Sequence, residues 1–188
     1  MRVIAGEARS LPLKTVRSLD IRPTTDKIKE TLFNILMPYL NGCRFLDLYA
    51  GSGAIGIEAI SRGAREAVFV DNSRAAQACI DDNLTFTKFK DRSRVIKSDV
   101  GTAIGRLEGG GAFDIIFMDP PYDEGLEKET LRALRESSLV DEETLIVVEA
   151  SLKTDFDYLE KWGYEVVKDK RYKSNRHLFL RRVKESGT

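Results

Sequence analysis

Short runs of apolar residues alternate with amphipathic stretches along the chain after Cys43. The apolar runs end at polar or turn-forming residues, and they predict strands at residues 45–49, 67–70, 94–97, 113–118 and 144–148. The stretches between and after these runs have helical spacing, and we expect helices at residues 55–62, 74–89, 102–107, 126–136 and 156–162. Strands that alternate with helices predict an α/β fold with a mainly parallel sheet.

The C-terminal region departs from this alternation. Two β-rich runs, residues 164–172 and 176–183, are separated by Lys173-Ser174-Asn175. They predict an antiparallel hairpin that completes a mainly parallel, seven-stranded sheet.

The N-terminal region carries a helical pattern of its own. Thr25 or Asp26 is a suitable N-cap for this helix, and Pro38 should lie at or near its end. We expect a single domain over residues 1–188, with an N-terminal arm and helix at residues 1–43 and an α/β core at residues 44–188.

Composition narrows the class of protein. Of 188 residues, 42% are hydrophobic and 32% are charged, which is typical of a globular protein that is not embedded in a membrane. No apolar run approaches the roughly 20 residues of a membrane span, and the first residues do not resemble a signal peptide, so we expect a cytoplasmic location. Cys43 and Cys79 lack metal-ligand or redox spacing and should be free, buried thiols, while His177 has no Cys or His partner nearby in the sequence. We therefore expect no metal site.

Charge is unevenly distributed although the formal net charge is zero. Residues 1–44 hold eight Lys/Arg against four Asp/Glu, and residues 161–188 hold nine against three. The intervening residues 45–160 hold thirteen against twenty-three. If the two basic ends meet in space, they form a cationic face suited to phosphates; the alternative is that they are simply solvated.

A glycine loop follows the first predicted strand of the core. The sequence Ala50-Gly51-Ser52-Gly53-Ala54-Ile55-Gly56 matches G-x-G-x-x-G between a strand and a helix. Asp71 ends the next predicted strand, 20 residues after Gly51, where a carboxylate can bind a ribose diol. Alone, this pattern also fits an NAD-dependent enzyme.

Two more acidic residues favour another cofactor. Asp47 precedes the loop and could accept a hydrogen bond from an ammonium group, and Asp99 follows the third predicted strand, where it could accept one from an adenine amine. An ammonium, a ribose and an adenine together describe S-adenosylmethionine. The pyrophosphate of NAD would instead be repelled by nearby carboxylates.

The tetrapeptide Asp119-Pro120-Pro121-Tyr122 follows a buried apolar run directly. The prolines stop the strand, and in open α/β sheets ligands bind at this end of the strands. Asp119 and the Pro120 carbonyl can accept hydrogen bonds from an amine, and Tyr122 can stack on a planar ring. Read alone, the tetrapeptide could equally be a turn that ends a strand.

With these motifs combined, the sequence resembles the RsmD-type methyltransferases, bacterial enzymes that methylate the N2 amine of a guanine in 16S ribosomal RNA. The resemblance covers nearly the whole chain. It is carried by residues 1–6, 22–26, 30–34, 46–53 and 56–59 and by the tetrapeptide at residues 119–122. It implies a Rossmann-like class I fold with S-adenosylmethionine as the cofactor, an N-terminal arm and helix at residues 1–43 that contribute to cofactor and RNA binding, and a catalytic core at residues 44–188.

The resemblance also implies roles for individual residues. The cofactor would be bordered or bound by Arg22, Thr24, Thr25, Asp47, Gly51, Ser52, Gly53, Asp71, Asn72, Asp99 and Val100. The target base would be held by the catalytic residues Asp119, Pro120, Pro121 and Tyr122. Phosphates of the RNA would meet Arg9, Lys14, Lys170, Arg171 and Lys173, although each of these could be an ordinary solvated charge.

Two stretches depart from the family pattern. Residues 8–14 of the arm are less basic than in the family, and Arg171-Tyr172 is followed by Lys173 where the family tends to have glycine. Both stretches lie in the expected RNA-binding ends. They put details of the substrate in question rather than methyl transfer itself.

We therefore expect methyl transfer to a guanine N2 amine of 16S ribosomal RNA, presented as naked RNA or as the small subunit, by a monomer or weak dimer. One alternative is a methyltransferase for a DNA adenine or a protein glutamine, although such enzymes usually carry Asn first in the tetrapeptide or an extra recognition segment. Another is an NAD-dependent oxidoreductase, for which no catalytic Tyr-x-x-x-Lys is evident. A non-catalytic RNA-binding module would leave the acidic residues unexplained.

Overall fold

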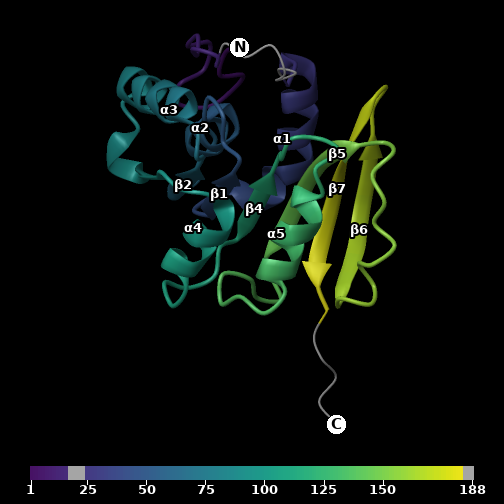
Figure 1. Ribbon diagram of the computed structural model, residues 1–188. Coiled ribbons are helices and arrows are strands. Elements are labelled where there is room, and N and C mark those ends of the chain that lie inside the picture. The colour runs from purple at the N-terminus through teal and green to yellow at the C-terminus, as the bar shows by residue number, and fades with distance from the viewer. Residues whose placement is uncertain (17–23, 184–188) are drawn as a thin grey trace. The chain divides into compact units, whose positions relative to one another are not determined.

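The computed structural model describes residues 1–16 and 24–183, and the chain divides into two compact units, Met1–Val100 and Gly101–Thr188 (Figure 1). Three strands belong to the first unit and four to the second, which confirms the predicted seven-stranded sheet. Within the described residues, no helix is both long and apolar enough to cross a membrane.

The first unit contains parallel strands in the order β3-β2-β1. β1 (Arg44–Leu48) pairs with β2 (Glu66–Val70), and β2 pairs with β3 (Ser93–Ile96). α2 (Ala54–Ser61) packs on β1 and β2, and α3 (Arg74–Thr87) packs on β3. β1 and β2 are buried at every position but their first, as expected for parallel strands in an α/β layer.

Helix α1 (Asp26–Leu40) precedes β1 and contacts α2. Thr25 is its N-cap, and the hydroxyl oxygen of Thr25 accepts a hydrogen bond from the Ile28 amide at 3.2 Å. Of the two caps that the sequence predicted, Thr25 is therefore the correct one. Pro38 lies inside the last turn of the helix. The proline is tolerated there because the carbonyl that loses its partner belongs to the exposed residue Asn34, where water can replace the bond.

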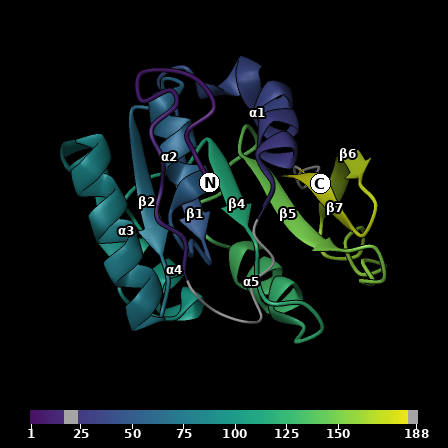
Figure 2. The ribbon, with the colours of Figure 1, turned by 90° about the horizontal axis from the view of Figure 1, so that it is seen from above.

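The N-terminal arm, residues 1–14, folds back on itself. The Val3 amide donates to the Leu11 carbonyl, and the Leu13 amide donates to the Met1 carbonyl, each at 2.9 Å. Val3, Ala8 and Leu13 are buried. Figure 2 shows this arm, in purple, passing over α2.

The second unit combines parallel and antiparallel pairing in the order β4-β5-β7-β6. β4 (Ile115–Met118) pairs in parallel with β5 (Leu145–Ser151). β7 (Asn175–Arg182) pairs antiparallel with both β5 and β6 (Tyr164–Arg171), which confirms the predicted C-terminal hairpin. Figure 1 shows β6 and β7 as the yellow strands of the second unit.

The remaining helices are α4 (Val100–Leu107), α5 (Leu126–Leu134) and a short 3-10 helix at Lys90–Arg92. The helix expected at residues 156–162 was predicted wrongly. These residues form consecutive turns, such as the one closed by the bond from the Leu159 amide to the Phe156 carbonyl. The carboxylate of Asp155 accepts a bond from the Asp157 amide at 2.8 Å, and such a local bond competes with helix formation.

Candidate cofactor and substrate sites

The glycine loop joins β1 to α2 through left-handed backbone. Gly51 has φ 58° and Gly53 has φ 79°, values that glycine adopts without steric cost. Gly56 serves packing instead. A Cβ at Gly56 would lie 2.3 Å from a ring carbon of Phe69 on β2, so the missing side chain lets α2 approach the strand. The loop thus has the backbone that its G-x-G-x-x-G pattern predicts.

Asp71, at the end of β2, closes this loop. Its Oδ2 accepts a hydrogen bond from the Gly51 amide at 2.9 Å, and its Oδ1 accepts one from the Ser73 amide at 2.9 Å. The sequence suggested a ribose-binding carboxylate, and the structure adds that this carboxylate holds the loop. Each oxygen keeps a second lone pair, so ribose hydroxyls can still donate to it.

Asp47 is a buried carboxylate in β1, directly before the loop. Its side chain accepts a hydrogen bond from the Gly56 amide at 3.0 Å, and the residue is 1% exposed. Burial raises the pKa of Asp47 well above its usual value, and Asp71 raises it further, while the Gly56 bond acts in the opposite direction. An approaching ammonium would stabilise the ionised carboxylate. A carboxylate at this position therefore fits the ammonium at the methionine end of S-adenosylmethionine.

The other residues predicted to contact the cofactor lie on the segments around the loop. Arg22 lies outside the described residues. Ser52 and Thr24 are half-buried, while Thr25 is exposed and caps α1. Three more follow the strands β2 and β3, namely the exposed Asn72 and Asp99 and the buried Val100.

The tetrapeptide at residues 119–122 begins where β4 ends. Met118 is the last residue of this fully buried strand, and the two prolines prevent its extension. Asp119 and Tyr122 are half-buried, Pro120 is buried and Pro121 is exposed. The tetrapeptide therefore lies at the carboxyl end of a parallel strand, as the sequence predicted.

The cations predicted to meet RNA have different surroundings. Lys14 is paired with Asp82 at 3.0 Å and Arg171 with Asp169 at 3.1 Å, both largely at the surface. Lys170 Nζ lies 5.9 Å from the centre of the Tyr172 ring. The two others, Arg9 and Lys173, are exposed.

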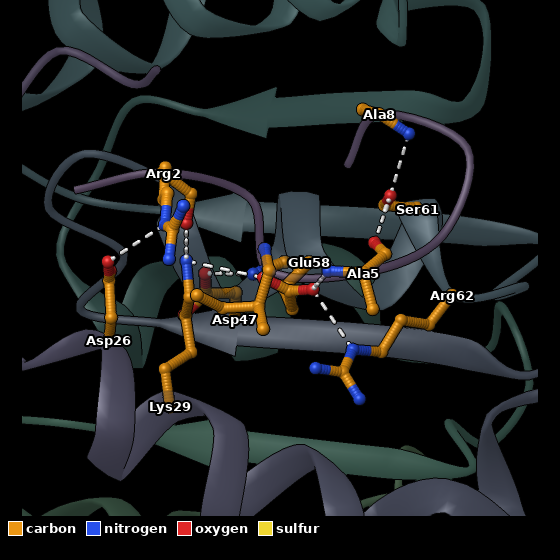
Figure 3. A network of polar contacts seen from close by, with 11 residues as sticks. Arg2, Ala5, Ala8, Asp26, Lys29, Asp47, Glu58, Ser61 and Arg62 are labelled. Atoms are coloured by element: carbon orange, nitrogen blue, oxygen red, sulfur yellow. Dashed lines mark hydrogen bonds and ion pairs between the residues drawn. The ribbon is translucent and has the colours of Figure 1, made fainter. Parts of the chain in front are cut away.

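Sequence reasoning missed a charged network beneath the N-terminal arm (Figure 3). Glu58 on α2 is fully buried and accepts bonds from the amides of Ile4 at 2.8 Å and Ala5 at 3.1 Å. The ammonium of Lys29 lies 3.3 Å from one oxygen of Glu58, and Arg62 donates to the other at 2.9 Å. Burial lowers the pKa of Lys29, and Glu58 opposes that effect. The signal available in the sequence was Glu58 itself, the one charged residue of the largely apolar helix α2.

A second missed network surrounds His177. Its Nε2 lies 3.1 Å from Glu149 on β5, and its Nδ1 lies 3.2 Å from the Tyr172 hydroxyl. Asn175 donates to the other oxygen of Glu149 at 3.0 Å. The sequence offers no Cys or His near His177, and the residues that contact its ring are a tyrosine and a glutamate. In the described part of the chain, no group of three or more His, Cys, Asp or Glu residues could hold a metal ion. Cys43 and Cys79 are buried free thiols, as predicted for these two residues.

Comparison with known proteins places these features in a family. The family model described as "Conserved hypothetical protein 95" matches residues 1–181. The chain is 37% identical over 153 residues to "Ribosomal RNA small subunit methyltransferase D" of Escherichia coli, covering 81% of this chain and 76% of that protein. The protein of the same name from Haemophilus influenzae is 33% identical over 163 residues, covering 86% of this chain and 84% of that protein.

A solved structure supports the same conclusion. The solved structure described as "Putative methyltransferase yhhF from Escherichia coli" superposes with a TM-score of 0.83 and 31% identity, over 98% of this chain and 99% of that one. The fold is therefore that of a Rossmann-like class I methyltransferase. Given the family-model match and the curated relatives, this chain belongs to the RsmD family.

Proposed function

We propose that this protein transfers a methyl group from S-adenosylmethionine to the exocyclic N2 amine of a guanine in small-subunit (16S) ribosomal RNA. The observation that carries the proposal is Asp119-Pro120-Pro121-Tyr122 at the carboxyl end of β4 in a chain of the RsmD family. Methyl transfer to ribosomal RNA agrees with the names of the curated relatives.

The residues of the first unit would hold the cofactor. S-adenosylmethionine, when bound, supplies an electrophilic methyl group on a sulfonium. Asp47 would accept bonds from the ammonium and Asp71 from the ribose hydroxyls, while Asp99 would accept one from the adenine amine. The glycine loop, with Gly51, Ser52 and Gly53, lets the backbone approach the methionine part closely.

The tetrapeptide would orient the nucleophile. The amine of guanine is a poor nucleophile because its lone pair is delocalised into the ring. Asp119 and the Pro120 carbonyl would accept bonds from the amine hydrogens, which directs the lone pair toward the methyl group, and Tyr122 would stack on the base. Orientation and charge stabilisation would supply much of the rate. The base must leave its stack, which costs less in an RNA loop than in a duplex.

Methyl transfer to 30S particles from cells lacking this gene tests the proposal. The wild-type protein should transfer tritiated methyl groups to one guanine, mapped by primer extension and mass spectrometry. Asp119→Ala should lose at least about a hundredfold in rate while it still binds S-adenosylhomocysteine, because Asp119 orients the amine rather than the cofactor. Full turnover by this variant would refute the assigned role of Asp119.

The same assay separates the alternatives. Transfer to DNA adenine or to a protein glutamine, with no label on the RNA, would replace the proposed substrate. A thermal shift with NAD but none with S-adenosylhomocysteine would favour an oxidoreductase, because a ligand of the folded state raises its stability. We further propose that the enzyme acts in the cytoplasm as a monomer or weak dimer.

A further inference from the structure

Asn83 on α3 touches both the N-terminal arm and the glycine loop. Its Oδ1 accepts a hydrogen bond from the Lys14 amide at 2.9 Å. Its amide nitrogen donates to the Lys14 carbonyl at 3.0 Å and to the Ser52 carbonyl at 2.9 Å. The residue is 1% exposed, so water does not compete for these bonds. The side-chain amide of Asn83 therefore fixes both the end of the arm, at Lys14, and the middle of the glycine loop, at Ser52.

The arm is held at its other end by α2. The Ser61 hydroxyl accepts a bond from the Ala8 amide at 2.9 Å and donates to the Ala5 carbonyl at 2.7 Å (Figure 3). Gly6 has φ 88°, and a Cβ there would lie 1.9 Å from the Ser61 carbonyl oxygen. These contacts do not include the glycine loop. The side chain of Asn83 thus bonds both the arm and the glycine loop.

From this geometry we infer that Asn83 is a positioning residue that couples cofactor binding to the order of the N-terminal arm. The inference rests on the proposed function, because it takes the loop at Ser52 as the cofactor site and the arm as part of the RNA-binding surface. A cofactor that fixes the loop also fixes the Ser52 carbonyl. Asn83 then keeps its amide in one orientation, which holds both polar groups of Lys14 in place.

The coupling acts in both directions because linkage is reciprocal. An arm that is docked on Asn83 stabilises the loop conformation to which the cofactor binds. RNA phosphates that hold the arm would therefore raise cofactor affinity, and bound cofactor would present the arm to RNA in an ordered state.

Hydrogen exchange with S-adenosylhomocysteine tests this coupling without RNA. In the wild-type protein, saturating ligand should slow exchange of the amides of Leu13 and Lys14 roughly five- to tenfold, since a fixed Asn83 amide strengthens its existing bonds to Lys14. Asn83→Ala should bind S-adenosylhomocysteine roughly five- to tenfold more weakly, for the same reason. In that variant the bound ligand should protect the loop but no longer the arm.

One further test variant and two control variants isolate the role of Asn83. Asn83→Asp keeps an acceptor for the Lys14 amide but has no donor for Ser52, so it should also lose the protection of the arm. Ser61→Ala removes the bonds that hold the arm on α2 and leaves the glycine loop unchanged. Thr87→Val removes another buried polar group from α3, the Thr87 hydroxyl, which donates to the backbone carbonyl of Asn83 at 2.8 Å. Both should keep ligand-dependent protection at Lys14.

The outcomes are distinguishable. If S-adenosylhomocysteine does not bind the wild-type protein, the proposed function fails. If it binds and protects the loop but leaves the exchange of Leu13 and Lys14 unchanged, the coupling is wrong and the function stands. Retained protection of the arm in Asn83→Ala would also overturn the inference. Should that variant not fold, the wild-type and Asn83→Asp measurements still decide the question.

Discussion

Among the described residues, each compact unit buries one glutamate, and the two units satisfy it with different chemistry. Glu58 in the first unit lies between two formal cations, Lys29 and Arg62, and two backbone amides. Glu149 in the second unit is bonded by the amide of Asn175 and the ring of His177. Glu58 fastens a distant segment of chain, whereas Glu149 joins neighbouring strands.

The two networks should differ in how strongly a substitution destabilises the fold. Removing one partner from a buried ion pair leaves an uncompensated charge in a medium of low dielectric constant, which makes the first network sensitive to substitution. Loss of Glu149 from the second network leaves unsatisfied hydrogen-bonding groups rather than a buried ammonium or guanidinium, and the cost is smaller. The arm is therefore held by an ion-pair network around Glu58 that is sensitive to substitution, which agrees with the role proposed for the arm beside the glycine loop.

The most damaging substitution should be Glu58→Ala. It leaves the buried ammonium of Lys29 without its ion-pair partner and should lower the free energy of unfolding by about 3–5 kcal/mol. Urea-induced unfolding followed by circular dichroism measures this. The matched control is Glu7→Ala in the arm, which removes the surface pair with Arg92 and should cost less than about 1 kcal/mol. Equal losses in both variants would contradict the distinction.

Glu149→Ala should be intermediate. It removes two hydrogen bonds, from the Asn175 amide and with one ring nitrogen of His177, and should lower the free energy of unfolding by about 1–3 kcal/mol in total. The loss should stay below that of Glu58→Ala in the same urea experiment. A greater loss would mean that the second network depends on charge as much as the first.

Tyr172→Phe should have a smaller effect, about 1 kcal/mol, because it removes one hydrogen bond to His177. Burial, with a further contribution from Glu149, raises the pKa of Tyr172 to about 12. Since the folded pKa exceeds the ordinary value near 10, stability is fully present below pH 10 and falls as pH rises from about 10 to about 12. Unfolding midpoints across this range should decline more steeply in the wild-type protein than in Tyr172→Phe.

Asp47 is a third buried carboxylate, and it differs from both glutamates because the bond it accepts from the Gly56 amide involves no side chain of another residue. Its raised pKa means that stability is present at acid pH and is lost as pH rises through the folded pKa. Asp47→Asn should therefore be slightly more stable than the wild-type protein at neutral pH, by about 1 kcal/mol or less. Its affinity for S-adenosylhomocysteine should fall at least about tenfold, because an ammonium loses its carboxylate.

Urea midpoints from about pH 4 to about pH 8 and calorimetric titration with the ligand check both expectations. Cofactor affinity of the wild-type protein should rise with pH through the pKa of Asp47, since the ammonium binds the ionised form. An Asn variant that binds the ligand normally would remove Asp47 from the cofactor site.

Local sequence patterns were enough to predict most elements and the backbone conformation of the glycine loop. Periodicity located the strands and most helices, because apolar spacing follows directly from strand and helix geometry. The glycine loop and Asp71 were predictable because backbone with positive φ requires glycine and because the acid ends the next strand. Residues 156–162 were misread because turns stabilised by local side-chain bonds carry the same apolar spacing as a helix.

The pairing of distant polar groups depends instead on the folded chain. Glu58 meets Ile4 across more than fifty residues, Asn83 meets Lys14 and Ser52, and Glu149 meets His177. No local pattern predicts such pairs, because a buried polar side chain is satisfied by whichever donors and acceptors folding brings to it. The sequence thus supplied the motifs of a methyltransferase, while folding joined its N-terminal arm to its glycine loop through Asn83.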